Sequence, residues 1–232
     1  MKKKLIRNLV LTGVFFALFL IFTVVIFAVD VQPIGPQGSR VGLATLNKAV
    51  FEATGTNMIW YEITDILGYI SLLLAACFGA LGIYQLIKRK SLLKVDHRIL
   101  LLGAFYVLVI GAYLIFELVS LNYRPILIDG ELEASYPSSH TMIVTCIMIT
   151  AMMVLHTIIP KKKAVLIASD VFCILFTAVT LIGRFLSGVH WFTDIIAGLL
   201  LSLALIYLYR SSVIFTDIKI NSSKNETLDE GE

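Results

Sequence analysis

The sequence has few charged residues. Asp, Glu, Lys and Arg make up 15% of its 232 residues, whereas roughly 25% is usual for soluble domains. Hydrophobic residues account for 58% of the chain, and the mean hydropathy is +0.90. A water-soluble protein of this length has no use for so much apolar surface. The composition therefore excludes a soluble globular domain and indicates an integral membrane protein.

Cysteine is also scarce. Cys77, Cys146 and Cys173 are the three cysteines, and all of them lie within apolar runs. This placement provides neither a disulfide framework nor the spacing of metal ligands, so we expect packing roles for them. The sequence also has no internal repeat or linker. We expect one membrane domain over residues 1–210, followed by a polar, acidic and disordered tail at 211–232.

Six apolar runs dominate the chain. Each comes close to the ~20 residues that a helix needs to cross a hydrocarbon core of about 30 Å. Because backbone within a bilayer must satisfy its own hydrogen bonds, we predict an all-α fold, an integral membrane bundle of six transmembrane helices. The runs cover approximately residues 9–29, 67–87, 99–119, 142–159, 164–183 and 191–209.

The basic residues predict how the bundle is oriented. With the N-terminus inside, 15 of the 19 Lys and Arg residues fall in inside segments. The positive-inside rule then predicts a multi-pass cell-membrane protein with both termini in the cytoplasm. The first run is followed by no A-x-A-like cleavage site, so we expect a retained anchor. The net charge of +3 reflects this topology and gives no reason to expect a nucleic-acid partner.

The outside segment 30–66 is long and contains a further helical pattern. Leu43, Leu46, Val50 and Phe51 would share one face of a helix. This spacing predicts an amphipathic helix in the membrane interface. We expect it to be a lid or packing element and not a catalytic one.

Two outside loops, residues 117–140 and 183–194, carry the residues suited to catalysis. In "GRFLSGVHWFTD", His190 and Asp194 are four residues apart and would share a helical face. A carboxylate that accepts a hydrogen bond from one ring nitrogen raises the basicity of the other. His190 is therefore a candidate nucleophile or base. Arg184 offers the planar donors that suit phosphate oxygens, although Arg184 and Asp194 could instead form an ordinary ion pair.

The other loop supplies a matching set of residues. It contains Arg124, followed by Pro125, and it ends in Ser138, Ser139 and His140 before the fourth run. A helix N-terminus binds anions through its free N–H groups, and either serine can add a hydroxyl donor. The alternative for the serines is a simple N-cap. His140 could act as a general acid toward a leaving oxygen.

Together these residues predict phosphoryl transfer through a covalent phosphohistidine. The two arginines would offset negative charge on the phosphoryl oxygens in the transition state, so no metal or other cofactor is required. A zinc site made of His140, His190 and Asp194 is an alternative. The neighbouring arginines argue against it because they would repel the cation.

These motifs resemble those of the type 2 phosphatidic acid phosphatase family, which includes the vanadium haloperoxidases. The family carries K-x6-RP, PSGH and SR-x5-H-x3-D; this chain has "ELVSLNYRP", "PSSH" and "GRFLSGVHWFTD". The resemblance extends over about residues 5–210. It implies that His190 is the nucleophile, that Asp194 orients it and that His140 protonates the leaving alcohol. It also implies phosphate binding by Arg124, Arg184 and Ser138.

Three positions depart from the family pattern. Glu117 occupies the position of the first-motif lysine, Ser139 that of the PSGH glycine, and Gly183 that of the serine before the third-motif arginine. A carboxylate at position 117 would weaken phosphate binding if it faces the site, unless it is paired or protonated. Alternatively, Glu117 points at the membrane interface and never meets the substrate.

We therefore expect a membrane lipid phosphatase whose site faces the extracytoplasmic side. Its substrate would carry a phosphate or diphosphate head group, as do phosphatidic acid, phosphatidylglycerol phosphate and polyprenyl pyrophosphate. The alternative is a catalytically impaired member that binds phospholipid or supports a partner. We see no broken helices or half-repeats of a transporter, and so hydrophobic a bundle argues against a haloperoxidase. Asp170 lies within the fifth run, where we expect either a partner near the inner interface or a side chain that snorkels outward, and not a catalytic role.

Overall fold

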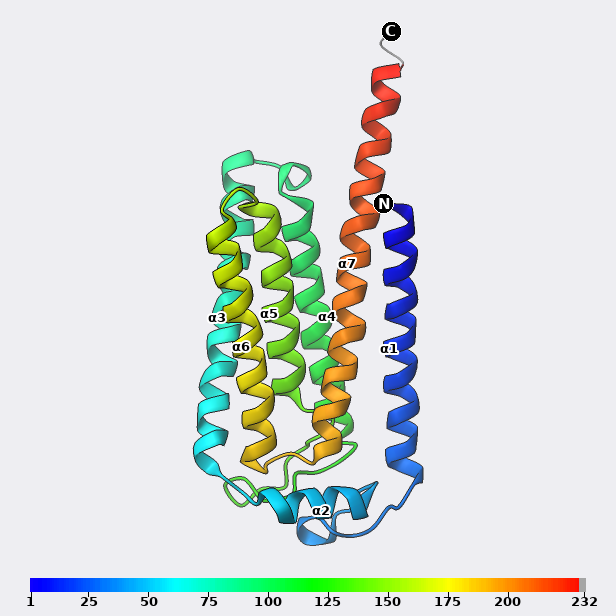
Figure 1. Cartoon of the computed structure of the whole chain (residues 1–232), viewed down its shortest axis with the longest axis vertical. Coiled ribbons are helices and arrows are strands. Elements are labelled where there is room, and N and C mark those ends of the chain that lie inside the picture. Colours follow the sequence, from blue (N-terminus) through cyan, green and yellow to red (C-terminus); the bar gives the residue numbers. More distant parts are fainter. Residues whose placement is uncertain (230–232) are drawn as a thin grey trace.

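The computed structural model of the chain describes residues 1–229, and its helices there form an upright bundle (Figure 1). Six of these helices are long and apolar enough to cross a membrane, as the sequence predicted. No strand occurs in the described range; only isolated bridging residue pairs are present. The six helices are α1 (Lys2–Ala28), α3 (Met58–Arg89), α4 (His97–Val119), α5 (Ser139–Ile158), α6 (Lys163–Ser187) and α7 (Phe192–Asp229).

A short helix, α2 (Ala44–Thr54), lies across one end of the bundle (Figure 1). The loop before α5 and the turn between α6 and α7 are found at this same end, which we call the α2 end. The N-terminus and the C-terminal part of α7 lie at the opposite end, the terminal end. Two 3-10 turns, η1 (Pro36–Gly38) and η2 (Leu92–Lys94), complete the helical elements. Which end faces the cytoplasm stays a prediction.

Helix α5 occupies the middle of the bundle and contacts α3, α4, α6 and α7. More than half of its apolar segment, 56%, is buried, compared with 11% for α1. Small and polar side chains such as Thr141, Thr145 and Ala151 are fully or almost fully buried on it. Such residues let membrane helices approach closely. Helix α1 packs mainly along α7 and leaves most of its surface free for lipid.

Helix α2 has the amphipathic character that was predicted, but it is anchored by a polar residue. Asn47 is fully buried and donates hydrogen bonds to the Gly42 carbonyl and the Thr193 hydroxyl, each 2.9 Å away. Its side-chain oxygen accepts a bond from the Thr193 backbone N–H at 3.2 Å. Leu46, which was expected on the apolar face of this helix, is 45% exposed. The helix is therefore fixed to the start of α7 by a specific polar contact.

The tail differs from the expectation of disorder. Helix α7 continues through residue 211 and ends at Asp229, while residues 230–232 lie outside the described range. Extending an existing helix avoids the cost of nucleation, because each added residue contributes a hydrogen bond. Asp217 also ties this extension to α4, since its Oδ1 lies 2.8 Å from His97 Nε2 and 3.0 Å from Arg98 NH2. The proposed domain boundary at residue 210 stays a prediction.

Candidate active site

The two predicted loops meet at the α2 end and are joined by a backbone hydrogen bond. Within the loop that connects α4 to α5, the Arg124 N–H donates to the Glu133 carbonyl at 3.0 Å, which folds the loop back on itself. The Ser138 N–H, at the end of this loop, donates to the backbone carbonyl of Asp194 at 3.0 Å. The start of α5 and the start of α7 are thereby held together.

His190 lies in the turn between α6 and α7 and is 5% exposed. Its Nδ1 atom is 3.1 Å from the backbone carbonyl oxygen of Ser135. A carbonyl can only accept, so Nδ1 carries the proton and Nε2 carries the lone pair. Nε2 is buried and has no hydrogen-bond partner among the described residues. This is the tautomer that a nucleophilic Nε2 requires.

The environment of His190 also favours its neutral form. Burial is the main reason that the pKa of His190 lies well below its usual value of 6.5, and the positive charges of Arg124, Arg184 and His140 lower it further. A neutral imidazole is the nucleophilic form. At neutral pH His190 is therefore in the neutral form that a nucleophilic role would require.

Asp194 is completely buried and close to His190, but its direct hydrogen bonds go elsewhere. Its Oδ2 lies 3.9 Å from His190 Nδ1, beyond hydrogen-bond distance. Oδ2 instead accepts from the Trp191 backbone N–H at 3.0 Å, and Oδ1 accepts from Asn122 Nδ2 at 3.2 Å. Asp194 lies in the first turn of α7, and by accepting the Trp191 N–H it caps the N-terminus of this helix. Asp194 thus fixes the turn that carries His190, while the Ser135 carbonyl orients the ring directly.

Arg184 lies near the end of α6 and is completely buried. Its NH2 group forms an ion pair with Asp65 on α3, and its guanidinium lies over the ring of Tyr61, 5.1 Å from the ring centroid. The ion pair with Asp194 that was considered as an alternative does not form. Nε and NH1 of Arg184 are buried without a hydrogen-bond partner in the described chain. Two donors of the guanidinium therefore remain available to a ligand.

Gly183 allows α6 to approach α3 closely enough for this contact. A Cβ atom added at position 183 would lie 2.5 Å from Thr64 Cγ2 and 2.9 Å from Trp60 Cε3. The serine found in the family pattern has no room here. The departure at position 183 thus has a packing explanation: glycine lets Trp60 and Thr64 of α3 lie directly against α6, one residue before Arg184.

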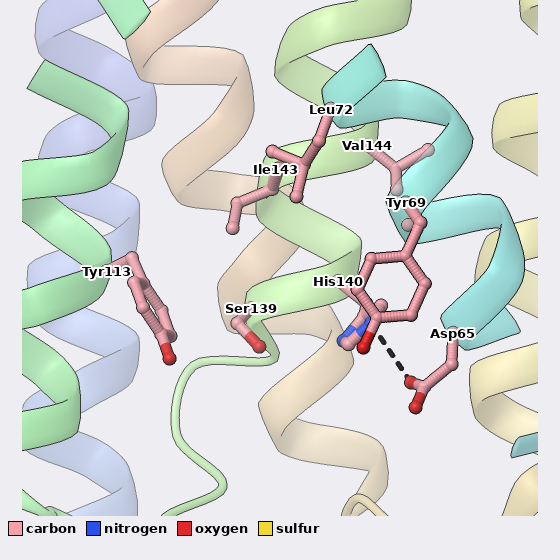
Figure 2. A pocket seen from close by; sticks show the side chains of 9 residues that line it. Asp65, Tyr69, Leu72, Tyr113, Ser139, His140, Ile143 and Val144 are labelled. Carbon is pink, nitrogen blue, oxygen red and sulfur yellow. Dashed lines mark ion pairs between the residues drawn. The ribbon is translucent and has the colours of Figure 1, made fainter. Parts of the chain in front are cut away.

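His140 lies in the first turn of α5 and points toward α3 (Figure 2). Its Nε2 is 3.1 Å from Asp65 Oδ1, the contact marked by the dashed line. Ser138 is the N-cap residue of α5, but its hydroxyl makes no capping hydrogen bond. That hydroxyl is fully buried and, like Nδ1 of His140, it has no partner among the described residues. A simple capping role therefore does not account for the Ser138 hydroxyl.

Arg124 projects from the folded-back loop and is 9% exposed. Its Nε lies 3.0 Å from Oε2 of Glu133, on the opposite side of the same loop. Its NH1 group is buried and unpaired within the described residues. Each of the two site arginines is thus paired with one carboxylate, and each keeps at least one free donor.

A cavity of about 310 Å³ brings Arg124, His140 and His190 together, whereas Arg184, Ser138 and Asp194 are not among its lining residues. Residues of both loops line it, namely Arg124, Glu133, Ser135, Pro137, Ser139, His140 and His190, together with Glu117 at the end of α4. Glu117 therefore faces this cavity and does not point away from it at the membrane interface. The carboxylate is exposed, so water can still solvate it.

A second cavity of about 230 Å³ adjoins the first and shares Tyr113, Ser139 and His140 with it. Figure 2 shows that Tyr113 of α4 faces this space from one side and that α3 and α5 contribute the other walls. Its apolar walls include Leu72, Ile143 and Val144. The site therefore combines a polar chamber with an apolar one, and His140 lies between them.

Four contributors to the site were missed in the sequence: Asp65, Asn122, Glu133 and Ser135. Asp170 was noticed because an acid within an apolar run is a functional candidate. Asp65 was missed because the second run was taken to begin at residue 67, whereas α3 begins at Met58. No comparable signal marks Ser135, which acts through its backbone carbonyl.

Asp170 has the partner that was expected: His156 Nε2 lies 2.8 Å from its Oδ2, at the terminal end. In the part of the chain that the structure describes, no group of three or more His, Cys, Asp or Glu side chains could hold a metal ion.

Two comparisons with known proteins found a similar family or a similar fold. Residues 114–216 match the family model of the PAP2 superfamily, and that segment contains both arginines, both histidines and Asp194. No curated protein matches the chain. The fold is similar to the crystal structure of the first transmembrane PAP2 type phosphatidylglycerolphosphate phosphatase from Bacillus subtilis, with a TM-score of 0.60 and 19% sequence identity over 90% of this chain and 97% of that one. The chain is therefore similar to the PAP2 superfamily over residues 114–216, and it is a multi-pass membrane phosphatase.

Proposed function

We propose that the chain removes phosphate from the head group of a membrane lipid through a phosphohistidine on His190. In the first step Nε2 of His190 bonds to phosphorus, the bond from phosphorus to the leaving oxygen breaks, and His140 gives a proton to that oxygen. In the second step a water molecule attacks phosphorus, the phosphorus–nitrogen bond breaks and inorganic phosphate leaves. The proton that the water loses returns to His140.

The observation that carries this proposal is the set of buried donors without partners beside a neutral histidine. These donors are Arg184 Nε and NH1, Arg124 NH1 and the Ser138 hydroxyl, all unpaired among the described residues. A buried polar group without a partner costs about 1–3 kcal/mol, so retaining several of them in one place favours a ligand that satisfies them. A phosphoryl group has three acceptor oxygens and bears the negative charge that suits two guanidinium groups.

The adjoining apolar cavity supports a lipid as the substrate. A phosphate in the polar chamber would leave the alkyl part of the leaving group close to Leu72, Ile143 and Val144. Candidate head groups are those of phosphatidic acid, phosphatidylglycerol phosphate and polyprenyl pyrophosphate; the structurally similar Bacillus subtilis protein is a phosphatidylglycerolphosphate phosphatase. The positive-inside distribution supports a site on the extracytoplasmic side, which would admit lipids of the outer leaflet.

A second candidate function is lipid binding without efficient catalysis. Glu117 on the cavity wall and the carboxylate partners of Arg124 and Arg184 favour it, because they reduce the positive charge available to a phosphate. The neutral, correctly protonated His190 favours the enzyme. A catalytic assay distinguishes the two functions directly.

The test is release of inorganic phosphate from phosphatidic acid, phosphatidylglycerol phosphate and undecaprenyl pyrophosphate by the purified protein in detergent. We expect release from at least one of these, unaffected by EDTA and abolished by His190→Ala. His156→Ala is the matched control, because His156 is a histidine at the terminal end, away from the site. Lipid binding without release from any of the three would favour the second candidate, and release that persists in His190→Ala would contradict the phosphohistidine.

A further inference from the structure

Asp65 contacts both the candidate acid and one of the candidate phosphate ligands, although it belongs to neither loop. It lies two turns into α3, and its Oδ1 is 3.1 Å from His140 Nε2. The same oxygen forms the ion pair with Arg184 NH2. Its side chain is 27% exposed, whereas that of Arg184 is fully buried. A single carboxylate oxygen thus links two residues that have separate tasks in the proposed reaction.

This contact makes the two ring nitrogens of His140 different. A carboxylate oxygen only accepts hydrogen bonds, so Nε2 carries a hydrogen toward Asp65. Nδ1 is buried and has no partner among the described residues. The nitrogen that is free to exchange a proton with a substrate is therefore Nδ1.

Gly68, one turn after Asp65, holds the same ring in position. A Cβ atom at position 68 would lie 2.8 Å from Cδ2 and 3.0 Å from Nε2 of His140. The imidazole therefore lies directly against the backbone of α3, and Asp65 holds the edge that faces this helix. Helix α3 thus fixes both the place of the ring and the identity of the protonated nitrogen.

We propose that Asp65 is a positioning residue of the reaction, which keeps the hydrogen on Nε2 of His140 and makes Nδ1 the proton donor to the leaving oxygen. By holding NH2 of Arg184, it also leaves Nε and NH1 of that guanidinium for the phosphate. This inference rests on the phosphatase function proposed above and assigns the atom that delivers the proton.

The proton balance of both steps follows from this assignment. At the start His140 carries hydrogens on both nitrogens. Burial, Arg184 and Arg124 disfavour this positive charge, and Asp65 offsets part of that cost. When the phosphorus–oxygen bond breaks, the Nδ1 proton moves to the leaving oxygen, and the neutral ring keeps its Nε2 hydrogen on Asp65. In the second step the attacking water returns a proton to Nδ1.

The experiment compares two leaving groups in Asp65→Asn. Asparagine keeps the size of the side chain and an oxygen acceptor for His140 and Arg184, but it loses the negative charge. A leaving group as weakly basic as p-nitrophenolate needs little help from a general acid, whereas an alkyl alcohol depends on it. For kcat/KM, we expect about a 10- to 100-fold loss with dioctanoyl phosphatidic acid. With p-nitrophenyl phosphate we expect at most about a threefold loss.

The outcomes separate this inference from the proposed function. Equal losses with the two substrates would overturn the assignment of Asp65, because a general disturbance of the site affects both alike. No release by the wild type from p-nitrophenyl phosphate or from any of the three lipids named above would instead overturn the proposed function, and this inference with it. Glu62→Gln, an exposed acid of the same helix, is the matched control and should leave both rates unchanged. Gly68→Ala, which displaces the ring of His140, should reproduce the selective loss with phosphatidic acid.

Discussion

The backbone carbonyl of Ser135 accepts a hydrogen bond from Nδ1 of His190, 3.1 Å away, although 55 residues separate the two in the sequence. In the motif the orienting partner is expected to be Asp194, whose Oδ2 is 3.9 Å from the same nitrogen. A backbone carbonyl can fix the tautomer of a histidine, as a carboxylate can, but it carries no full charge. The Ser135 carbonyl therefore orients the ring of His190, while Asp194 contributes negative charge near it. A substitution at Asp194 can separate these two roles.

Asp194→Asn should weaken the enzyme without abolishing its activity. The Ser135 carbonyl would still hold Nδ1–H, so Nε2 of His190 would remain the nucleophile. The variant loses the buried negative charge near the ring and disturbs the bonds to Trp191 and Asn122. We expect a loss of about 10- to 100-fold in kcat/KM, measured as phosphate release, with His190→Ala defining the background. Activity at that background would show that Asp194 is as essential as the nucleophile.

Lowering the pH toward 6.5 should not reduce kcat/KM by protonating His190. The nucleophile is the neutral ring, and burial with nearby positive charge puts the pKa of His190 well below 6.5. Protonation would remove the nucleophile only as the pH falls through this lowered pKa. The measurement is the pH dependence of kcat/KM with a substrate whose phosphate does not ionise in this range. We expect the midpoint of its acidic limb to lie below about pH 6.5. A limb centred at or above that value would contradict a neutral, buried nucleophile.

Glu117→Lys should strengthen substrate binding. Glu117 lines the cavity that Arg124, His140 and His190 share, so its negative charge opposes a bound phosphate. Reversing this charge at an exposed position should lower KM by a few-fold to about tenfold, and less at high salt. Glu131→Lys reverses an exposed charge in the loop after α4, away from the cavity walls, and it should change KM little. Equal effects of both substitutions would mean that only the net surface charge matters.

Gly183→Ala should destabilise the protein, because the new Cβ would come within 2.5 Å of Thr64 and 2.9 Å of Trp60. Overpacking of this kind costs about 1–3 kcal/mol. The measurement is the thermal midpoint in detergent. The matched control is Gly79→Ala, because a Cβ at position 79 meets nothing within 4 Å. A second substitution, Thr64→Ala, should restore part of the lost stability by making room. An unchanged midpoint in Gly183→Ala would show that α3 and α6 can separate freely.

Much of the architecture and of the site could be predicted from the sequence. The six helices follow from six apolar runs, because a bilayer forces a spanning segment into a helix. His190, Asp194, Arg184, Arg124 and His140 lie in two short loops with motif spacing, and the structure brings these loops together. The tail was predicted less well. Its polar composition argues for disorder, but the helix that precedes it can be extended at low cost, and Asp217 contacts α4.

Local patterns in the sequence thus determined the membrane class, the number of spans and the chemical groups available for catalysis, since each depends on composition or on spacing along the chain. Only the tertiary structure decided which partner each group has. Arg184 pairs with Asp65, 119 residues away, and His190 is held by a backbone carbonyl that no side-chain pattern can reveal. The room for these contacts comes from helix packing, as at Gly183 against Thr64. Such contacts depend on distances between helices, and these distances are set when all six pack together.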